Sequence, residues 1–505
     1  MSDYKLSNSL MKEPKHDMYR TETERRKLPT TNSKPGRTLD EDPERLTEYT
    51  LPPAKFPVDD FKFIVLSGNY PSTPRNMMNA RSNWKELEDE DEAIETAHMM
   101  WRPVNYGISG YEKLNKRRKN SKFPLIFNHF ESIRCISTKT GLIRTLKKYY
   151  GFNQDAIDAK YTVFHTTPTT FLVDDTLSCT NLQKNLIRHV EKYLPEKHWL
   201  KNLWLVKPEG LNRGRGIEVF NSLKDIMSFI GAKNPNMRYV VQKYIERPML
   251  YHGRKFDIRV WAIYTGDDSR VYFYKRGYIR TSSDEFTTKI NDNKAVHLTN
   301  NWFQQHLENY GKFEDGNTLS FEKMQEYIDE QFPEYNINFY DHFIKRMKDI
   351  AIDVYLAAKE EFNKSKREHW FELFGFDFMI DEDFRIWLIE WNTNPYFGIP
   401  NKFIADLLPR MISEMFEIIV DPIYPPRRKV PLPERNFELI YSPEKNTRQP
   451  FNTPLYPIRE PEKLSPNSRK GMRSRIKKSR AVYKRNNSEA RQTSKSIPRS
   501  VDLRK

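Results

Sequence analysis

Between residues 343 and 362 the apolar positions recur at the spacing of an α-helix. The side chains concerned, separated by four or three residues, are Phe343, Met347, Ile350, Val354 and Ala357. Lysine, aspartate and glutamate recur between them, so one face of the helix is apolar and the other is charged. The pattern predicts a long amphipathic helix that packs against a core.

Runs rich in β-branched and aromatic residues predict strands before and after this helix. They cover residues 61–68, 202–210, 238–246, 253–265, 271–282, 370–381 and 384–392. Only Glu382 and Asp383 separate the last two runs, which predicts a hairpin. Shorter helices are expected over 138–151 and 222–232. This succession predicts an α+β fold, with a sheet backed by helices, rather than a doubly wound α/β fold.

Composition marks the borders of the folded part. Residues 1–56 are mostly polar and charged and cannot bury enough apolar surface to fold, so a disordered N-terminal segment is expected. A small α/β domain is predicted over 57–150. Residues 421–466 hold eleven of the 32 prolines, which predicts an extended linker over 421–465. Beyond it, 466–505 is expected to be a basic disordered tail.

The charge of the chain is concentrated in this tail. The last forty residues hold fourteen Lys or Arg against Glu489 and Asp502, so +12 of the net +16 lies there, which points to an acidic partner. The two cysteines, Cys135 and Cys179, provide no disulfide framework and no metal cluster. Neither a signal peptide nor an apolar run of about 18 residues is present, so a soluble intracellular protein is expected.

The first candidate for chemistry is a lysine beside a glycine-rich loop. Lys207 is followed by Gly210, Gly214 and Gly216. Glycines let backbone amides approach a phosphate, and the lysine adds a positive charge. An ordinary hairpin turn with an exposed lysine would show the same pattern.

Two strands that follow carry polar residues that are candidates for ligand binding. The end of one, Gln242-Lys243-Tyr244-Ile245, could pair its backbone with the edge of a purine, although an ordinary buried strand explains it too. In the next strand Lys255, Asp257 and Arg259 face one way because side chains alternate. A solvated strand face is the alternative reading.

The predicted hairpin places acids in apolar surroundings. Glu390 and Asn392 share a face, and Asp377 can lie opposite them. Two carboxylates and an amide oxygen are ligands for a hard cation such as Mg²⁺ that bridges substrate phosphates. Without a metal, two buried acids would repel and one would be forced neutral. The alternative is a pair of exposed acids on an edge strand.

In this order, these pieces resemble the nucleotide site of the ATP-grasp ligases and, more narrowly, of the tubulin-tyrosine-ligase-like family. The resemblance covers roughly residues 120–420 and is carried by NHFESIRCISTKTGL (128–142), TPTTF (167–171), WLVKPEGLNRGRGI (204–217), VVQKYIERPMLYHGRKFDIRVW (240–261), GYIRTSS (277–283), HLTNNWFQ (297–304) and FGFDFMIDEDFRIWLIEWNTNP (374–395). It implies an ATP-grasp-like fold in which a central domain (151–250) and a C-terminal catalytic domain (251–420) hold ATP.

The resemblance also implies roles for individual residues. Those implied to bind ATP are Lys139, Lys207, Gly214, Gly216, Gln242, Lys243, Tyr244, Ile245, Lys255 and Asp257. Those implied to bind Mg²⁺ are Asp377, Glu390 and Asn392. Arg259 and Arg280 match arginines that hold the reacting carboxylate or the incoming amino acid, and His297 and Asn300 belong to a loop over the site.

The implied activity is ATP-dependent ligation of an amino acid to glutamate side chains, through an acyl phosphate, on tubulin or similar acidic tails. The polyglycylase branch is the most similar, so glycine is the expected donor, with a polyglutamylase of the same mechanism as the alternative. A non-catalytic microtubule-binding protein is the alternative of another class. A monomer is expected in the cytoplasm, on the cytoskeleton or at the cilium or basal body, with no membrane partner and no specific nucleic acid.

Overall fold

The computed structural model describes residues 60–104, 108–120, 123–173, 202–211, 214–232, 238–266, 269–288, 296–427 and 435–453. The predicted disordered segment 1–56 and the basic tail 466–505 lie outside these ranges. Mixed helices and sheets confirm the predicted α+β class.

The first sheet consists of four parallel strands in the order β2-β1-β3-β4. They are β1 (Phe61–Val65), β2 (Trp84–Glu86), β3 (Met99–Trp101) and β4 (Ile126–Phe127). Three helices accompany them: α1 (Ser72–Asn79), α2 (Glu90–Thr96) and α3 (Ile108–Asn120). Parallel strands with helical connections make this region an α/β unit, and the predicted domain border at residue 150 stays a prediction.

A second, antiparallel sheet has the order β5-β8-β6-β7. Its strands are β5 (Thr170–Val173), β6 (Trp204–Pro208), β7 (Glu218–Phe220) and β8 (Tyr239–Lys243), followed in the chain after β7 by α8 (Leu223–Gly231). The glycine-rich loop joins β6 to β7. The strand, glycine loop, strand and helix predicted over 202–232 are thus confirmed.

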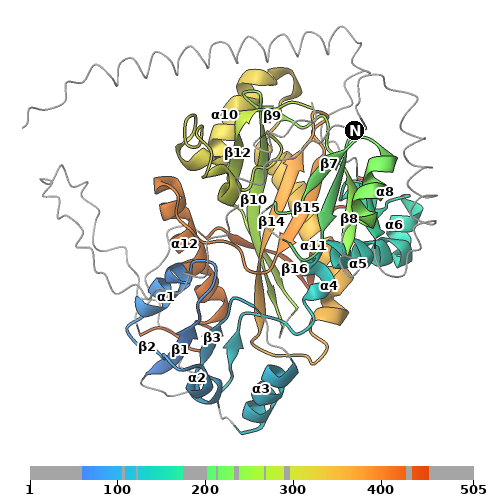
Figure 1. Cartoon of the computed structure of the whole chain (residues 1–505). Helices are drawn as coiled ribbons and strands as arrows, with labels where there is room; N and C mark the ends of the chain where they lie inside the picture. Colours follow the sequence, from blue (N-terminus) through green and yellow to red (C-terminus); the bar gives the residue numbers. More distant parts are fainter. Residues whose placement is uncertain are drawn as a thin grey trace, which may run out of the picture. The chain divides into compact units, whose positions relative to one another are not determined.

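The third sheet has nine strands and is built around the long strand β10. Its members are β9 (Leu250–Tyr251), β10 (Arg254–Thr265), β11 (Val271–Tyr274), β12 (Tyr278–Glu285), β13 (Thr318–Leu319), β14 (Phe371–Ile380), β15 (Ile386–Asn392), β16 (Phe437–Ser442) and β17 (Lys445–Asn446). One edge of β10 pairs with β12 and then β11, and the other pairs with β14. β14 and β15 form the predicted antiparallel hairpin (Figure 1).

Successive side chains of β10 point to opposite faces of the sheet, and the two faces pack in different hydrophobic cores. Phe256, Ile258 and Val260 enter the same core as the predicted amphipathic helix, observed as α11 (Lys345–Phe362). On the opposite face, Trp261 and Ile263 pack in a second core with α12 (Lys402–Ile419) and with β1. Among the described residues, the other α-helices are α4 (Arg134–Ser137), α5 (Lys139–Phe152), α6 (Gln154–Asp158), α9 (Asn301–Gln304) and α10 (Phe321–Gln331).

Two expectations from the sequence were wrong. The run 271–282 is not one strand, because Lys275 to Gly277 turn the chain between β11 and β12. The proposed linker 421–465 is folded over 435–453, where β16 pairs with β11 and extends the large sheet. Arg448 fixes this segment to α11 by donating to both carboxylate oxygens of buried Asp353, at 2.6 and 3.0 Å. The high proline content predicted an extended linker, but the prolines lie before and after β16 and none lies within it.

Candidate active site

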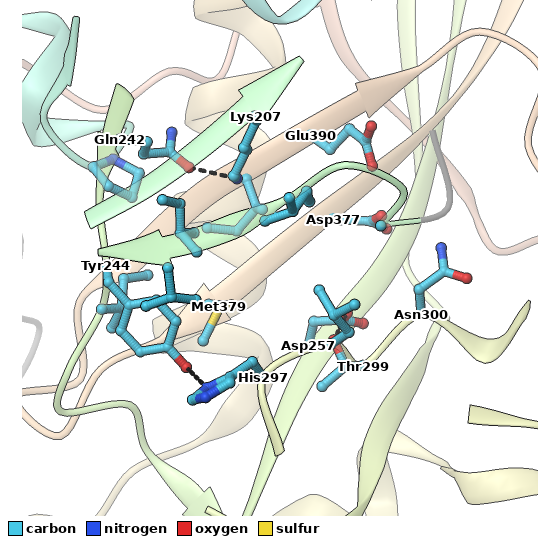
Figure 2. Close-up of a pocket in the computed structure, with 18 of the residues that line it drawn as sticks. Lys207, Gln242, Tyr244, Asp257, His297, Thr299, Asn300, Asp377, Met379 and Glu390 are labelled. Atoms are coloured by element: carbon cyan, nitrogen blue, oxygen red, sulfur yellow. Dashed lines mark hydrogen bonds between the residues drawn. The ribbon is translucent and has the colours of Figure 1, made fainter. Parts of the chain in front are cut away.

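A cavity of about 450 Å³ lies between the second sheet and the β10-β14-β15 part of the third. Figure 2 shows strands of both sheets directing side chains into it. Twelve of the residues assigned from the sequence line this cavity: Lys139, Lys207, Gly214, Gln242, Lys243, Tyr244, Ile245, Lys255, Asp257, Arg280, Asp377 and Glu390. His297 and Asn300 line it as well. Residues separated by up to 251 positions therefore converge on one cavity.

Lys207 is buried, which excludes the reading as a hairpin turn with an exposed lysine. Its amine donates to Oε1 of Gln242 on the neighbouring strand at 2.7 Å, and Gln242 in turn donates to Thr170 at 2.9 Å. Burial, together with the charge of Lys139, lowers the pKa of Lys207 from 10.5 to about 8. An anion in the cavity would restore the charged form.

Lys255 is a second buried amine. It donates to the backbone oxygen of His297 at 2.8 Å and lies over the ring of Tyr244. Burial, together with the charge of Lys207, lowers the pKa of Lys255 to about 7. The Tyr244 hydroxyl lies 2.8 Å from Nδ1 of His297, as Figure 2 shows. These contacts fix His297 and the residues that follow it against the end of β8.

Lys139 approaches the cavity from the first turn of α5. Its amine donates to the backbone oxygen of Leu211 at 2.8 Å, which joins α5 to the glycine-rich loop. In that loop Gly214 and Gly216 have φ of 75° and 69°, a left-handed conformation that glycine adopts without strain. A Cβ on Gly214 would also lie 2.9 Å from Leu298, on the loop that faces it.

A buried network of charges forms one wall of the cavity. Arg259 donates to both oxygens of Asp377, at 2.6 and 3.1 Å. Arg280 donates to Asp257 at 2.6 Å, and its Nη2 lies 2.9 Å from Asp377. Asp257 also accepts from the hydroxyl of Thr299. The solvated-face reading of this strand is therefore wrong, because its charged side chains are buried and paired.

This network changes what was expected of the acids. Burial alone would raise the pKa of Asp377, but Arg259 and Arg280 outweigh it and hold that pKa below 3.8. Asp377 therefore stays charged without a metal, because two arginines compensate its charge. Burial lowers the pKa of Arg259, and the charge of Asp377 more than reverses this.

The side-chain oxygens of Glu390 and Asn392 do not take part in the charge network and are candidates for binding a cation. Glu390 lies opposite Asp377 in the hairpin, and Asn392 lies opposite Gly375. Within the described residues, neither side chain makes a hydrogen bond or an ion pair, and Figure 2 shows Glu390 beside Asp377. A free carboxylate next to a second one, close to two amines, fits a hard cation bound together with phosphates. The described residues contain no cluster of three His, Cys, Asp or Glu side chains suited to an all-protein metal site.

Three assigned residues do not line the cavity. Gly216 lies further along the glycine-rich loop, outside the cavity. Arg259 is buried and bonded to Asp377, and Asn392 lies two residues after Glu390 on β15. The cavity is also lined by residues that were not predicted from the sequence, notably Thr299, Met379 and Ile389. Thr299 could have been found from its place between His297 and Asn300, whereas the two apolar residues carry no distinguishing signal.

The fold and the site are ATP-grasp-like. The model of the tubulin-tyrosine ligase family matches residues 119–430, which is more than half of the chain and includes every residue assigned to the site. The chain belongs to this family.

Several curated proteins are similar to the chain over about half its length. A tubulin glycylase 3A of Drosophila melanogaster is 35% identical over 271 residues, covering 52% of this chain and 26% of the relative. A tubulin glycylase 3B of Tetrahymena thermophila is 34% identical over 250 residues, or 49% and 21%. The human tubulin monoglycylase TTLL3 is 34% identical over 255 residues, or 48% and 31%. The matches thus span about a fifth to a third of these relatives.

Among the described residues, no helix combines the length and the apolar character needed to cross a bilayer.

Proposed function

We propose that the protein is an ATP-dependent ligase that joins glycine to glutamate side chains of an acidic protein segment, with tubulin as the acceptor. The observation that carries this proposal is the convergence of buried Lys207 and Lys255 with paired Asp377 and Glu390 in one cavity. Amines for phosphates and carboxylates for a bridging cation are the set required for phosphoryl transfer. The names of the similar relatives support glycine as donor and tubulin as acceptor.

Each part of the cavity has a proposed task. The end of β8, from Gln242 to Ile245, takes the base of the nucleotide. Lys139, Lys207 and Lys255 take its phosphates, and the amides of the glycine-rich loop approach them. Carbonyl oxygens hold these three amines in place, so the site is organised before the nucleotide binds.

Asp377, Glu390 and Asn392 are the residues that would hold Mg²⁺. When bound, such a cation neutralises charge on the phosphates. Because Asp377 is already paired with two arginines, Glu390 supplies the least compensated negative charge at this position.

The chemistry follows from the poor reactivity of a carboxylate. One oxygen of the acceptor carboxylate attacks the terminal phosphorus of ATP, the bond to ADP breaks, and an acyl phosphate forms. The deprotonated amine of glycine then attacks the carbonyl carbon, inorganic phosphate leaves, and an amide bond forms. Arg280 lines the cavity and is the arginine placed to contact an anionic substrate. Arg259 acts through Asp377 and is a positioning residue.

The cellular setting is proposed on the same basis. An enzyme with this acceptor would act in the cytoplasm on microtubules, including those of cilia. The domain borders at 150, 250 and 420 stay proposals, with the change that 435–453 belongs to the folded catalytic part.

Donor choice tests the proposal most sharply. Purified protein is incubated with ATP, Mg²⁺ and tubulin, together with labelled glycine in one reaction and labelled glutamate in another. We expect incorporation of glycine into tubulin, much weaker incorporation of glutamate, and incorporation of glycine about 100-fold or more slower in Glu390→Gln. Equal or better use of glutamate would replace the proposed donor, and incorporation of neither would refute the ligase.

A further inference from the structure

Exposed apolar side chains gather at one end of the cavity. Within the described part of the chain, four of the eight most exposed large apolar residues belong to loops or to the short helix α9 around this end. They form what we call the apolar rim: Tyr70 (47% exposed), Trp302 (41%), Tyr396 (42%) and Ile399 (43%). Exposed apolar residues scattered singly need no explanation, but a group beside a reactive site indicates an interaction surface.

The rim is continuous with the residues of the site. Trp302 follows Asn300, which lines the cavity and accepts a hydrogen bond from the backbone of Trp302 at 2.9 Å. Tyr396 follows Asn392 by four residues. Its loop is held near the charge network, because a Cβ on Gly375 would lie 3.0 Å from Pro395. Trp302 and Tyr396 therefore each follow closely, in the chain, a residue assigned to the site.

Contacts between the loops join the two parts of the rim. The hydroxyl of Tyr310 donates to Asn301, next to Trp302, at 2.8 Å. A Cβ on Gly316 would lie 3.4 Å from the same hydroxyl and 3.2 Å from Pro400, next to Ile399. Trp302 and Ile399 thus border one stretch of surface.

Tyr70 completes the rim from the loop between β1 and α1. Its ring meets that of Tyr396 edge to face, with 5.5 Å between centroids. The neighbouring Asn69 donates to the backbone oxygen of Asn394 at 2.8 Å. The backbone of Tyr70 has a φ of 64°, which residues other than glycine rarely adopt. The loop holds Tyr70 in this unfavourable conformation and leaves its ring half exposed.

The ligand of the apolar rim follows from the end of the cavity at which the rim lies. Figure 2 shows Tyr244 and His297 at one end of the cavity, and Asp377, Glu390 and Asn300 at the other. The proposed function places the base at the first end and the reacting phosphate at the second. The acceptor carboxylate must reach this second end, so the peptide on either side of it has to cross the rim.

We infer that the apolar rim binds the extended acidic segment of the acceptor protein that flanks the modified glutamate. This inference rests on the proposed function and adds the surface that recognises its substrate. Tyrosine and tryptophan rings offer large contact areas with little loss of side-chain entropy. Exposed Lys402, three residues after Ile399, makes no ion pair among the described residues and complements an acidic segment.

The test compares rim variants with a control at a more exposed aromatic residue outside the rim. Tyr396→Ala and Trp302→Ala should each raise KM for the protein acceptor about tenfold or more, with KM for ATP unchanged. Tyr396→Phe should stay near wild type because it keeps the ring. Gly398→Ala should behave like Tyr396→Ala, because a Cβ at Gly398 would overlap the Tyr396 ring and displace it.

Phe152→Ala serves as the matched control. Phe152 is 82% exposed at the far end of α5, about 20 Å along that helix from Lys139. It should leave both KM values unchanged. If the rim variants also leave KM for the acceptor unchanged, or raise KM for ATP equally, the inference is wrong.

Failure of the proposed function gives a different result. A wild-type protein that modifies no acceptor with any donor would refute the ligase itself. In that case binding of a fluorescent acidic peptide still tests the rim, since wild type should bind it and Tyr396→Ala should bind about tenfold more weakly. Equal binding by the two proteins would refute the rim as a docking surface.

Discussion

Nucleotide binding should weaken as the pH rises above 7, because the amines that receive the phosphates are partly neutral in the free protein. Burial, together with the charge of Lys207, lowers the pKa of Lys255 to about 7, and burial with the charge of Lys139 lowers that of Lys207 to about 8. Bound phosphates favour the charged amines and raise both pKa values. Binding therefore takes up protons, and the affinity falls above the pKa of the free amine.

The magnitude follows from the protonated fractions. Between pH 7 and pH 9 the protonated fraction of Lys255 falls from about one half to about one hundredth, a loss of about 50-fold in affinity. Lys207 adds up to about tenfold over the same range. The combined loss is smaller than the product, because the amine that loses its proton first raises the pKa of its neighbour.

Titration calorimetry with a non-hydrolysable ATP analogue measures this effect. At pH 7.5, comparison of buffers with different ionisation enthalpies should show uptake of about one proton. Lys255→Arg is the matched variant, because a guanidinium stays charged throughout this range and should flatten the pH dependence. Equal affinity of the wild type at pH 7 and pH 9 would refute the reasoning, as would an unchanged decline in Lys255→Arg.

Four further outcomes are expected. Glu390→Gln should keep the fold and lower the ligation rate by about 100- to 1,000-fold. Asp377→Asn should in addition destabilise the protein in denaturant titrations by about 3–5 kcal/mol, because it leaves buried Arg259 without its carboxylate, whereas Arg280 keeps Asp257; a fully stable Asp377→Asn would contradict the network. Arg448→Ala should destabilise by a similar amount by leaving Asp353 buried and unpaired, and a loss below about 1 kcal/mol would show that residues 435–453 are not anchored. Removal of 466–505 should raise KM for an acidic polymer, leave kcat unchanged and lose its effect at high salt; a collapse of kcat would contradict the predicted tether.

Local pattern predicted most of the site because its residues lie on regular elements. Alternation placed Lys255, Asp257 and Arg259 on one face of β10, and the two-residue spacing placed Glu390 and Asn392 on one face of β15. The short turn at Glu382 and Asp383 was enough to predict the hairpin that brings Asp377 opposite Glu390. The resemblance to a known family then supplied the association between the two sheets, which no local pattern contains.

The parts that escaped prediction depend on contacts between distant segments. The pairing of β16 with β11 joins residues more than 160 positions apart, and nothing within 437–442 distinguishes it from an isolated extended run. The bonds from Arg259 and Arg280 to Asp377 follow from strand register across three strands, which the sequence alone does not fix. Burial of these charges is therefore a property of the assembled sheet.

The acyl phosphate is the central claim of the proposed mechanism, and transfer of a heavy oxygen isotope tests it directly. An acidic acceptor peptide labelled with heavy oxygen in its glutamate carboxylates is incubated with the protein, ATP, Mg²⁺ and glycine, and the inorganic phosphate is examined by mass spectrometry. The mechanism predicts one labelled phosphate for each glycine joined to the peptide, because the oxygen that attacks ATP leaves with the phosphate. Glycine incorporation with unlabelled phosphate would contradict it.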